Sequence, residues 1–173
     1  MVVAVELKAF ERDELPLVEP WFEDVETRRW LGGPQWPRQM LDLAERPLSE
    51  FRGAVETGRY RWLAWNGGGA VGYCDAGTFD RWTTWDGERV IGTVPVTSAS
   101  IAFVVAPTQR RRGYGAAILE ALKQATELTD VELLAAGVEP ANDASVACLQ
   151  RAGFDALDPR PDFEGFLYYA WRR

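Results

Sequence analysis

The chain has 173 residues, of which 47% are hydrophobic and 26% charged, as in an ordinary soluble protein that buries a core without disulfides. It contains no histidine and only two cysteines, Cys74 and Cys148, which excludes a zinc site of the usual Cys/His type and a Ser-His-Asp triad. A net charge of -7 argues against general nucleic-acid binding; it could attract a cationic ligand such as an amine or simply maintain solubility.

The N-terminal region gives an expectation of location. It lacks a cationic segment followed by an apolar core, and no run approaches the roughly 18 apolar residues that span a bilayer. We therefore expect a cytoplasmic protein without membrane contacts, in which residues 1–173 form a single domain.

The first third of the chain is predicted to be mainly helical. Weak alternation over 2–7 indicates a first strand. Apolar spacing then predicts a helix over 13–21, a shorter turn over 26–31, and a helix over 37–44 that ends before Pro47.

The middle of the chain is predicted to consist of hairpins. Strands over 60–65 and 70–79 flank the glycine-rich turn at 66–69, and a smaller hairpin turns at Asp86-Gly87 within the connection over 80–98. Several tryptophans stand near Gly, Pro or Asp in expected loops, where they could wall a pocket for an apolar or cationic ligand: Trp30, Trp36, Trp82 and Trp85. Core packing is the alternative for each of them.

The stretch from Ile101 to Leu122 has the pattern of a strand, a basic turn and a helix. An apolar run stops at Pro107, the turn reads Arg110-Arg111-Arg112-Gly113-Tyr114-Gly115, and apolar residues then recur at helical spacing. A helix N-terminus offers free backbone N–H groups, the glycines allow close approach, and the arginines add positive potential. The turn is therefore expected to bind a phosphate-bearing ligand, although the spacing fits neither the nucleotide P-loop nor the dinucleotide fingerprint.

A second motif follows downstream. Residues 131–138 are predicted to form a strand, Asn142 is a suitable N-cap for the next helix, and Gly153 lies where that helix would end, before Phe154. Residues 155–163 indicate a loop, and 165–171 a last strand.

Together, the Arg-x-x-Gly-x-Gly turn and the closing Asn142 to Gly153-Phe154 segment resemble the GNAT superfamily of acyl-CoA-dependent N-acyltransferases, over roughly residues 60 to 173. The resemblance implies an α/β (α+β) fold with a central mixed, mostly antiparallel twisted sheet of about seven strands, flanked by helices and splayed between two parallel strands. It also implies acetyl-CoA as co-substrate and no metal. The cofactor-binding residues it implies are Val104, Val105, Arg110, Arg111, Arg112, Gly113, Tyr114, Gly115, Ala116, Asn142 and Ser145.

In this family the acetyl group passes directly to a primary amine, and a backbone N–H, here near Val104 or Val105, bonds the thioester carbonyl. With no histidine, the general base should be a carboxylate or a water held by one, and the candidates are Glu139, Asp75 and Asp80, with Glu139 preferred. Many members carry a tyrosine where this chain has Leu149, so the general acid is open between water, Tyr114 and Tyr168. Cys148 is expected to be a buried helix residue rather than a nucleophile.

The acceptor remains open at this point. It could be a small cationic metabolite, an antibiotic, or a protein or peptide amine, and the helical region over 13–44 is expected to decide its identity. The alternative is an acetyl-CoA-binding sensor or a catalytically weak member of the family. Nucleic-acid binding by Arg110 to Arg112 is disfavoured because the rest of the chain is acidic, and a homodimer is possible.

Overall fold

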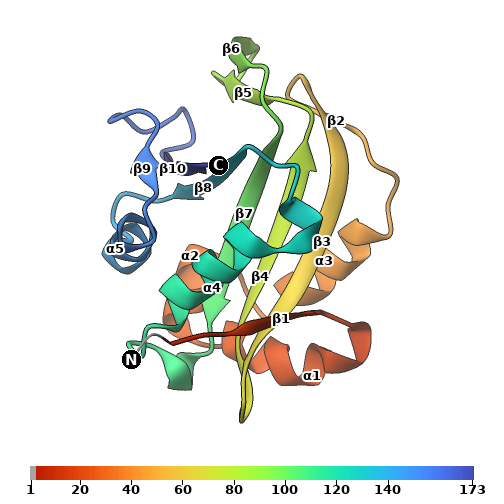
Figure 1. Ribbon diagram of the computed structural model, residues 1–173, viewed down its shortest axis with the longest axis vertical. Helices are drawn as coiled ribbons and strands as arrows, with labels where there is room; N and C mark the ends of the chain where they lie inside the picture. The colour runs from red at the N-terminus through yellow and green to blue at the C-terminus, as the bar shows by residue number, and fades with distance from the viewer. Residues whose placement is uncertain (1–2) are drawn as a thin grey trace.

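The computed structural model describes residues 3–173 and is built around one twisted sheet (Figure 1). Its strands follow the order β1-β3-β4-β7-β8-β10-β9, with β2 paired to β3, and a separate hairpin consists of β5 and β6. The strands are β1 (Glu6–Ala9), β2 (Glu50–Phe51), β3 (Ala54–Asn66), β4 (Gly69–Phe79), β5 (Trp82–Trp85), β6 (Val90–Val94), β7 (Ser98–Val105), β8 (Leu133–Val138), β9 (Asp155–Ala156) and β10 (Leu167–Arg172).

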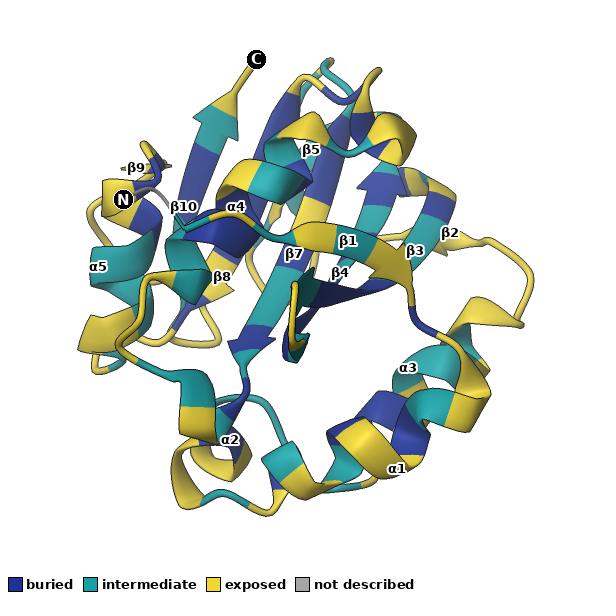
Figure 2. Cartoon of the chain, turned by 60° about the horizontal axis from the view of Figure 1, so that its bottom comes forward, coloured by how far each residue is buried: buried dark blue, intermediate teal, exposed yellow. Residues whose placement is uncertain are grey.

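Helices cover both faces of the sheet. They are α1 (Leu15–Val18), α2 (Val25–Trp30), α3 (Trp36–Ala44), α4 (Tyr114–Gln124) and α5 (Asp143–Arg151). One core joins the sheet to α4 and α5 through Ile118, Leu122 and Leu149, and a second core joins the other face to the N-terminal helices through Val18 and Phe22. Figure 2 shows the buried residues concentrated in the central strands and on the helix surfaces turned toward them.

The splay predicted from the resemblance is present between β7 and β8. These are parallel neighbours, but they pair only from Ser98 to Ser100, opposite Leu133 to Ala135. Beyond Ser100 the two strands separate, while β7 stays paired with β4 up to Val105. All other strand pairs are antiparallel, so the predicted mixed, mostly antiparallel sheet is confirmed.

Two element predictions differ from the structure. The helix expected over 13–21 is α-helical only from Leu15 to Val18 and is flanked by 3-10 turns, because Pro20 cannot donate the hydrogen bond that would continue it. The strand expected over 60–65 instead runs from Ala54 to Asn66, with an irregularity between Glu56 and Gly58 that hides its period from the sequence. The first strand begins at Glu6; position 2 of its predicted range lies outside the described residues.

The remaining predicted elements are confirmed within a few residues. They include the hairpin with its turn after Asn66, the small hairpin around Asp86-Gly87, α3, the strand–turn–helix unit of β7 and α4, and α5 with its cap.

Candidate functional site

The basic turn leads into α4 with its backbone amides exposed for a ligand. Gly113 caps the helix with a φ of +86°, a left-handed conformation that favours glycine. The first backbone hydrogen bond of the helix is donated by the Ala117 N–H to the Gly113 carbonyl. Among residues 3–173, the N–H groups of 113–116 have no acceptor, so they are free to bind an anion.

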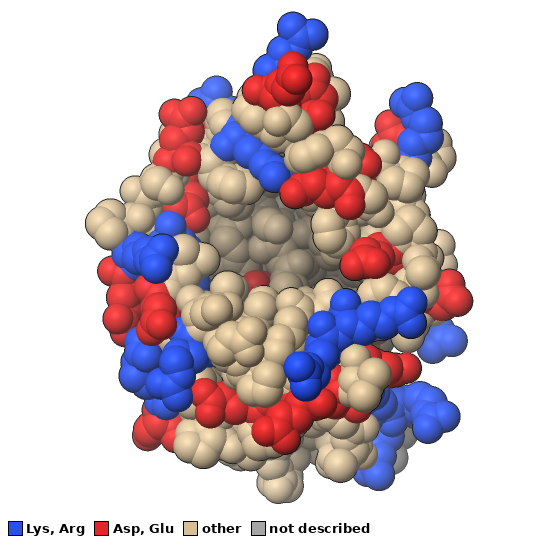
Figure 3. Space-filling view, turned by 180° about the vertical axis from the view of Figure 1, so that it is seen from behind, with Lys and Arg blue, Asp and Glu red and all other residues tan. Residues whose placement is uncertain are grey.

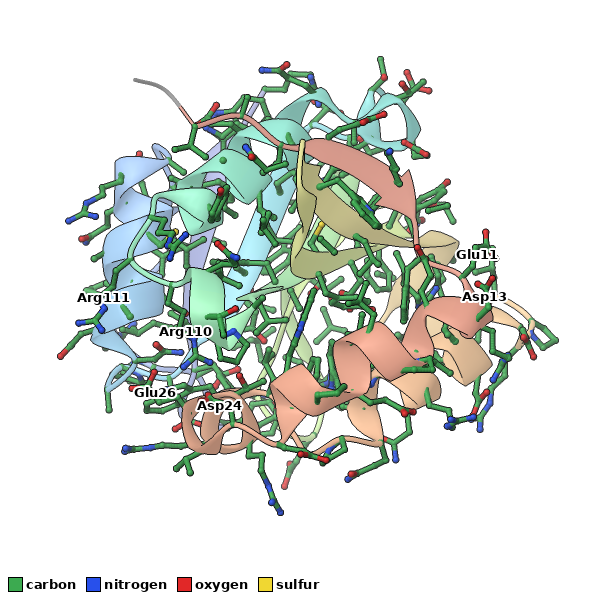
Figure 4. All side chains as sticks on the ribbon, turned by 90° about the horizontal axis from the view of Figure 1, so that it is seen from below. Glu11, Asp13, Asp24, Glu26, Arg110 and Arg111 are labelled. Atoms are coloured by element: carbon green, nitrogen blue, oxygen red, sulfur yellow. The ribbon has the colours of Figure 1, made fainter. Side chains whose placement is uncertain are left out.

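The three arginines of the turn have different surroundings. The Arg110 guanidinium donates to Asp24 at 2.6 Å, to Glu26 at 3.0 Å and to the Thr27 hydroxyl at 2.7 Å. Figure 4 shows Arg110 pointing to Asp24 and Glu26, whereas Arg111 lies at the outer edge of the molecule. Arg110 therefore ties the turn to α2, and the exposed Arg111 and Arg112 are the side chains available to a phosphate.

The ladder between β4 and β7 determines which amides face the splay. The Ala106 N–H donates to the Val71 carbonyl, and antiparallel pairs alternate, so the backbone groups of Val104 point to β4. The backbone groups of Phe103 and Val105 therefore point away from β4, toward the gap that β8 leaves. Of the two residues named from the sequence, Val105 is the one placed to bond a carbonyl in the splay.

Helix α5 borders the same region. The Asn142 side chain accepts a hydrogen bond from the Ser145 N–H at 3.2 Å, which confirms its predicted capping role. A Cβ on Gly115 would lie 2.7 Å from the Cys148 sulfur, so α4 and α5 approach closely at this point. Burial raises the pKa of the Cys148 thiol to about 11, which keeps it protonated and unreactive at neutral pH. Leu149 is buried in the core.

Asp75 lies on β4, directly opposite Ala102 of β7, on the sheet face covered by the N-terminal helices. The Tyr73 hydroxyl donates to its carboxylate at 3.1 Å. Burial raises the pKa of Asp75 to about 6, although the Tyr73 hydroxyl and the Arg61 guanidinium act in the opposite direction. A carboxylate with a pKa near neutrality is suited to accept and release a proton.

Tyr73 holds this carboxylate by its hydrogen bond, and Arg61 lies beside it without bonding it. Arg61 of β3 is paired in register with Asp75, and burial lowers the pKa of its guanidinium. Among the described residues, the buried Nε of Arg61 has no hydrogen-bond partner and the guanidinium forms no ion pair. Tyr73 is held by edge contacts to Phe10 and Trp36, with ring centroids 5.3 and 5.5 Å apart.

The surroundings of the other two candidates, Asp80 and Glu139, are less suited to a general base. Asp80 accepts from Arg81 and from the Val55 N–H, and these hydrogen bonds hold its pKa below the ordinary value. Glu139 is exposed just beyond the end of β8. The structure thus distinguishes Asp75 from Glu139, which the sequence had favoured, because only the fold reveals the burial of Asp75.

A cavity of about 490 Å³ opens on the same sheet face. Figure 3 shows this face hollowed at its centre, with a small acidic patch visible inside the hollow. The cavity is lined by residues around β2, the β5–β6 hairpin, the start of β7 and the segment over 157–168. None of its lining residues comes from 13–44, the region expected from the sequence to determine the acceptor.

The tryptophans expected near a pocket separate into two groups. Trp82 and Trp85 line the cavity. Trp36 instead stacks on Phe22 in the second core, so the pocket interpretation is wrong for Trp36. Trp30 packs against the Arg29 guanidinium and does not line this cavity. Proximity to Gly and Pro did not distinguish a core ring from a cavity ring.

No group of three or more Cys, Asp or Glu side chains in residues 3–173 is placed to hold a metal ion. Within the same range, every helix is too short or too polar to cross a bilayer.

Comparison with known proteins identifies the family of the chain. Residues 5–155 match the model of the acetyltransferase (GNAT) domain. The chain is 28% identical over 164 residues to the uncharacterized N-acetyltransferase YfmK of Bacillus subtilis strain 168, covering 92% of this chain and 91% of that protein.

Solved structures share the fold at low sequence identity. Aminoglycoside acetyltransferase AAC(6')-Ib in complex with coenzyme A and kanamycin superposes with a TM-score of 0.73 at 17% identity, covering 98% of this chain and 95% of that one. An aminoglycoside N(6')-acetyltransferase from Legionella pneumophila gives a TM-score of 0.68 at 15% identity, covering 99% and 94%.

The family match spans most of the chain, and it agrees with the splayed sheet and with the turn before α4. The fold class, the acyltransferase class and the acetyl-CoA co-substrate predicted from the sequence are thereby confirmed. The chain belongs to the GNAT family of acetyltransferases.

Proposed function

We propose that the protein is an N-acetyltransferase that moves the acetyl group of acetyl-CoA directly to a primary amine, with Asp75 as the general base. The observation that carries this proposal is the half-buried Asp75 carboxylate, whose pKa of about 6 lies close to neutral pH. It faces the cavity side of the sheet, one strand away from the splay.

The donor side would use backbone and exposed arginines. We propose that the pyrophosphate of acetyl-CoA binds the free N–H groups of 113–116 together with the Arg111 and Arg112 side chains. Asn142 and Ser145, at the start of α5, border the same region. The Val105 N–H is proposed to bond the thioester carbonyl. This bond would favour the transition state, in which negative charge develops on that oxygen.

The proton balance assigns a role to Asp75. At neutral pH a primary amine is an ammonium ion with a pKa of roughly 10, so it loses one proton to solvent to become the nucleophile and a second proton as the amide forms. Asp75, ionised at neutral pH, would accept the second proton directly or through one water, while the N–C bond forms and the C–S bond breaks. Leu149 has no proton to donate, so we propose that water protonates the departing thiolate.

The test is release of free thiol from acetyl-CoA across a panel of amines: polyamines, aminoglycosides, arylalkylamines, amino acids and short peptides. We expect thiol release that depends on the amine, with an N-acetylated product identified by mass. Tight acetyl-CoA binding with only slow, amine-independent hydrolysis would contradict the proposal and favour a sensor. The cytoplasmic location and the homodimer stay predictions.

A further inference from the structure

Aromatic rings dominate the lining of the cavity. Phe79, Trp82, Trp85, Phe163, Phe166 and Tyr168 surround it, and Trp82 packs edge-on against Tyr168 with ring centroids 5.5 Å apart. The rim is also apolar: Phe51 is 54% exposed, Ile91 57% and Phe163 48%. Large apolar side chains left open around a concave site are typical of a ligand-binding surface.

The charged side chains of the lining already have hydrogen-bond or ion-pair partners. Arg52 bonds Glu164 at 3.1 Å, and Arg81 bonds Asp80 at 2.6 Å. Arg160 and Asp158 pair with each other at 3.2 Å. Asp86 accepts from the N–H groups of Glu88 and Arg89, and Asp162 accepts from those of Glu164 and Phe166. Every carboxylate that lines the cavity therefore has a partner, and a ligand with several ammonium groups would have to compete with these bonds.

The cavity leads toward Asp75 along one face of the sheet. Ser100 lines the cavity and is the last β7 residue paired with β8 before the splay. Ser100 is paired with Gly77, and Ala102, two residues farther along β7, is paired with Asp75. Residues two apart on a strand share a face, so the Asp75 carboxylate lies on the same face as Ser100, one cross-strand pair farther along the sheet. Two residues of strand span about 7 Å, a distance that a short alkylamine chain can bridge.

We propose that the acceptor is a small primary amine with a single positive charge on a flat apolar body, of the arylalkylamine type, rather than a polycation. The body would stack on Trp82 and Trp85, and the amine would extend past Ser100 toward Asp75. This inference rests on the proposed function. In the reaction the ammonium ion first loses one proton to solvent, the amine nitrogen then bonds the acetyl carbon, Asp75 takes the second proton from the nitrogen, and coenzyme A leaves as a thiolate that water protonates.

Two measurements distinguish the identity of the acceptor from the presence of acetyl transfer. Thiol release is measured with phenethylamine, tryptamine and phenylbutylamine against spermidine and kanamycin, and binding of the same amines is measured by calorimetry in the presence of coenzyme A. We expect kcat/KM for the arylalkylamines to exceed that for spermidine and kanamycin by at least about tenfold, the equivalent of 1.4 kcal/mol.

Variants of the ring residues sharpen the test. Trp85→Ala and Trp82→Ala should raise the arylalkylamine KM about tenfold, with kcat and acetyl-CoA affinity nearly unchanged. Trp30→Ala, which removes a tryptophan of α2 outside the cavity lining, is the matched control. Trp82 also contacts the Leu133–Ala135 core, so Trp85→Ala decides if Trp82→Ala fails to fold.

The outcomes distinguish the two levels of inference. Preference for kanamycin or spermidine, or no binding of arylalkylamines at millimolar concentration, would overturn the acceptor assignment and leave the acetyltransferase proposal standing. Arylalkylamine binding that Trp85→Ala weakens, without amine-dependent thiol release, would support the assignment of the cavity and overturn the proposed function.

Discussion

The donor turn and the acceptor cavity are built in opposite ways. The turn and its flanking strand and helix are contiguous, from Ser98 to Gln124, and their function depends on backbone N–H groups. The cavity combines side chains from four separate segments between Phe51 and Tyr168. A site made of backbone constrains the sequence locally, as at Gly113, whereas a site made of scattered side chains leaves no local pattern. Asp75 lies between the two regions, and substitutions can test each of them separately.

The largest effect is expected at Asp75, the proposed general base. Asp75→Asn should lower kcat by about 10²- to 10⁴-fold, because general base catalysis is lost, while acetyl-CoA binding stays intact. In the parent protein, kcat/KM should fall below about pH 6 as the carboxylate is protonated, and this limb should vanish in the variant. Pre-steady-state thiol release over pH 5–8 measures both. Glu139→Gln, at an exposed site, is the control, and an equal loss there would contradict the assignment.

The contribution of Asp75 to folding stability should depend on pH in the opposite direction from its contribution to activity. Its folded-state pKa is raised, so the folded protein binds this proton more tightly than the unfolded chain does. The contribution of Asp75 to stability is therefore full below about pH 4 and is lost as the pH rises through about 6. Above that pH, Asp75→Asn should unfold at the same or a higher temperature than the parent, and a large decrease in Tm would indicate a structural role instead.

The next largest effect is expected at the donor turn. Gly113→Val should weaken acetyl-CoA binding by about tenfold or more, because the side chain crowds the free N–H groups and valine disfavours a φ of +86°. Gly153→Val is the matched control: its φ is +76°, and no atom lies within 4 Å of the position of an added Cβ. Calorimetry of acetyl-CoA binding should be affected only by the first variant. Unchanged affinity in folded Gly113→Val would reject the pyrophosphate assignment.

The arginines should separate into a ligand-binding and a structural group. Arg111→Ala and Arg112→Ala should each weaken acetyl-CoA binding about three- to tenfold without a change in Tm, more strongly at low salt. Arg110→Ala should lower the free energy of unfolding by about 1–2 kcal/mol, because it removes charged hydrogen bonds to Asp24, Glu26 and the buried Thr27. An affinity loss at Arg110 larger than at its neighbours would contradict this division.

The smallest effect is expected at Asn142. Asn142→Ala removes the side-chain cap on the Ser145 N–H and should lower stability by about 1 kcal/mol, together with a modest loss of activity. Asn142→Asp, which keeps the cap, is the control in thermal unfolding. A large activity loss in Asn142→Ala at full stability would point to a catalytic contact with the co-substrate.

The sequence alone determined the donor half of the protein. The strand, the Arg110 to Gly115 turn, α4, Asn142 and Gly153 lie close together in the chain, and each has a local physical reason that a sequence pattern can reveal. The fold class and the co-substrate followed from them.

Only the tertiary structure identified the residues of the proposed acceptor side, namely Asp75 and those that line the cavity. We propose Asp75 rather than Glu139 as the base because strand pairing buries Asp75 beside Tyr73 and Arg61, and burial depends on residues distant in sequence. Likewise, Trp36 joined the core and Trp85 the cavity although both stand near Gly or Pro, since packing rather than local composition positions a ring. Local backbone geometry is encoded locally, whereas burial and concavity arise from the whole chain.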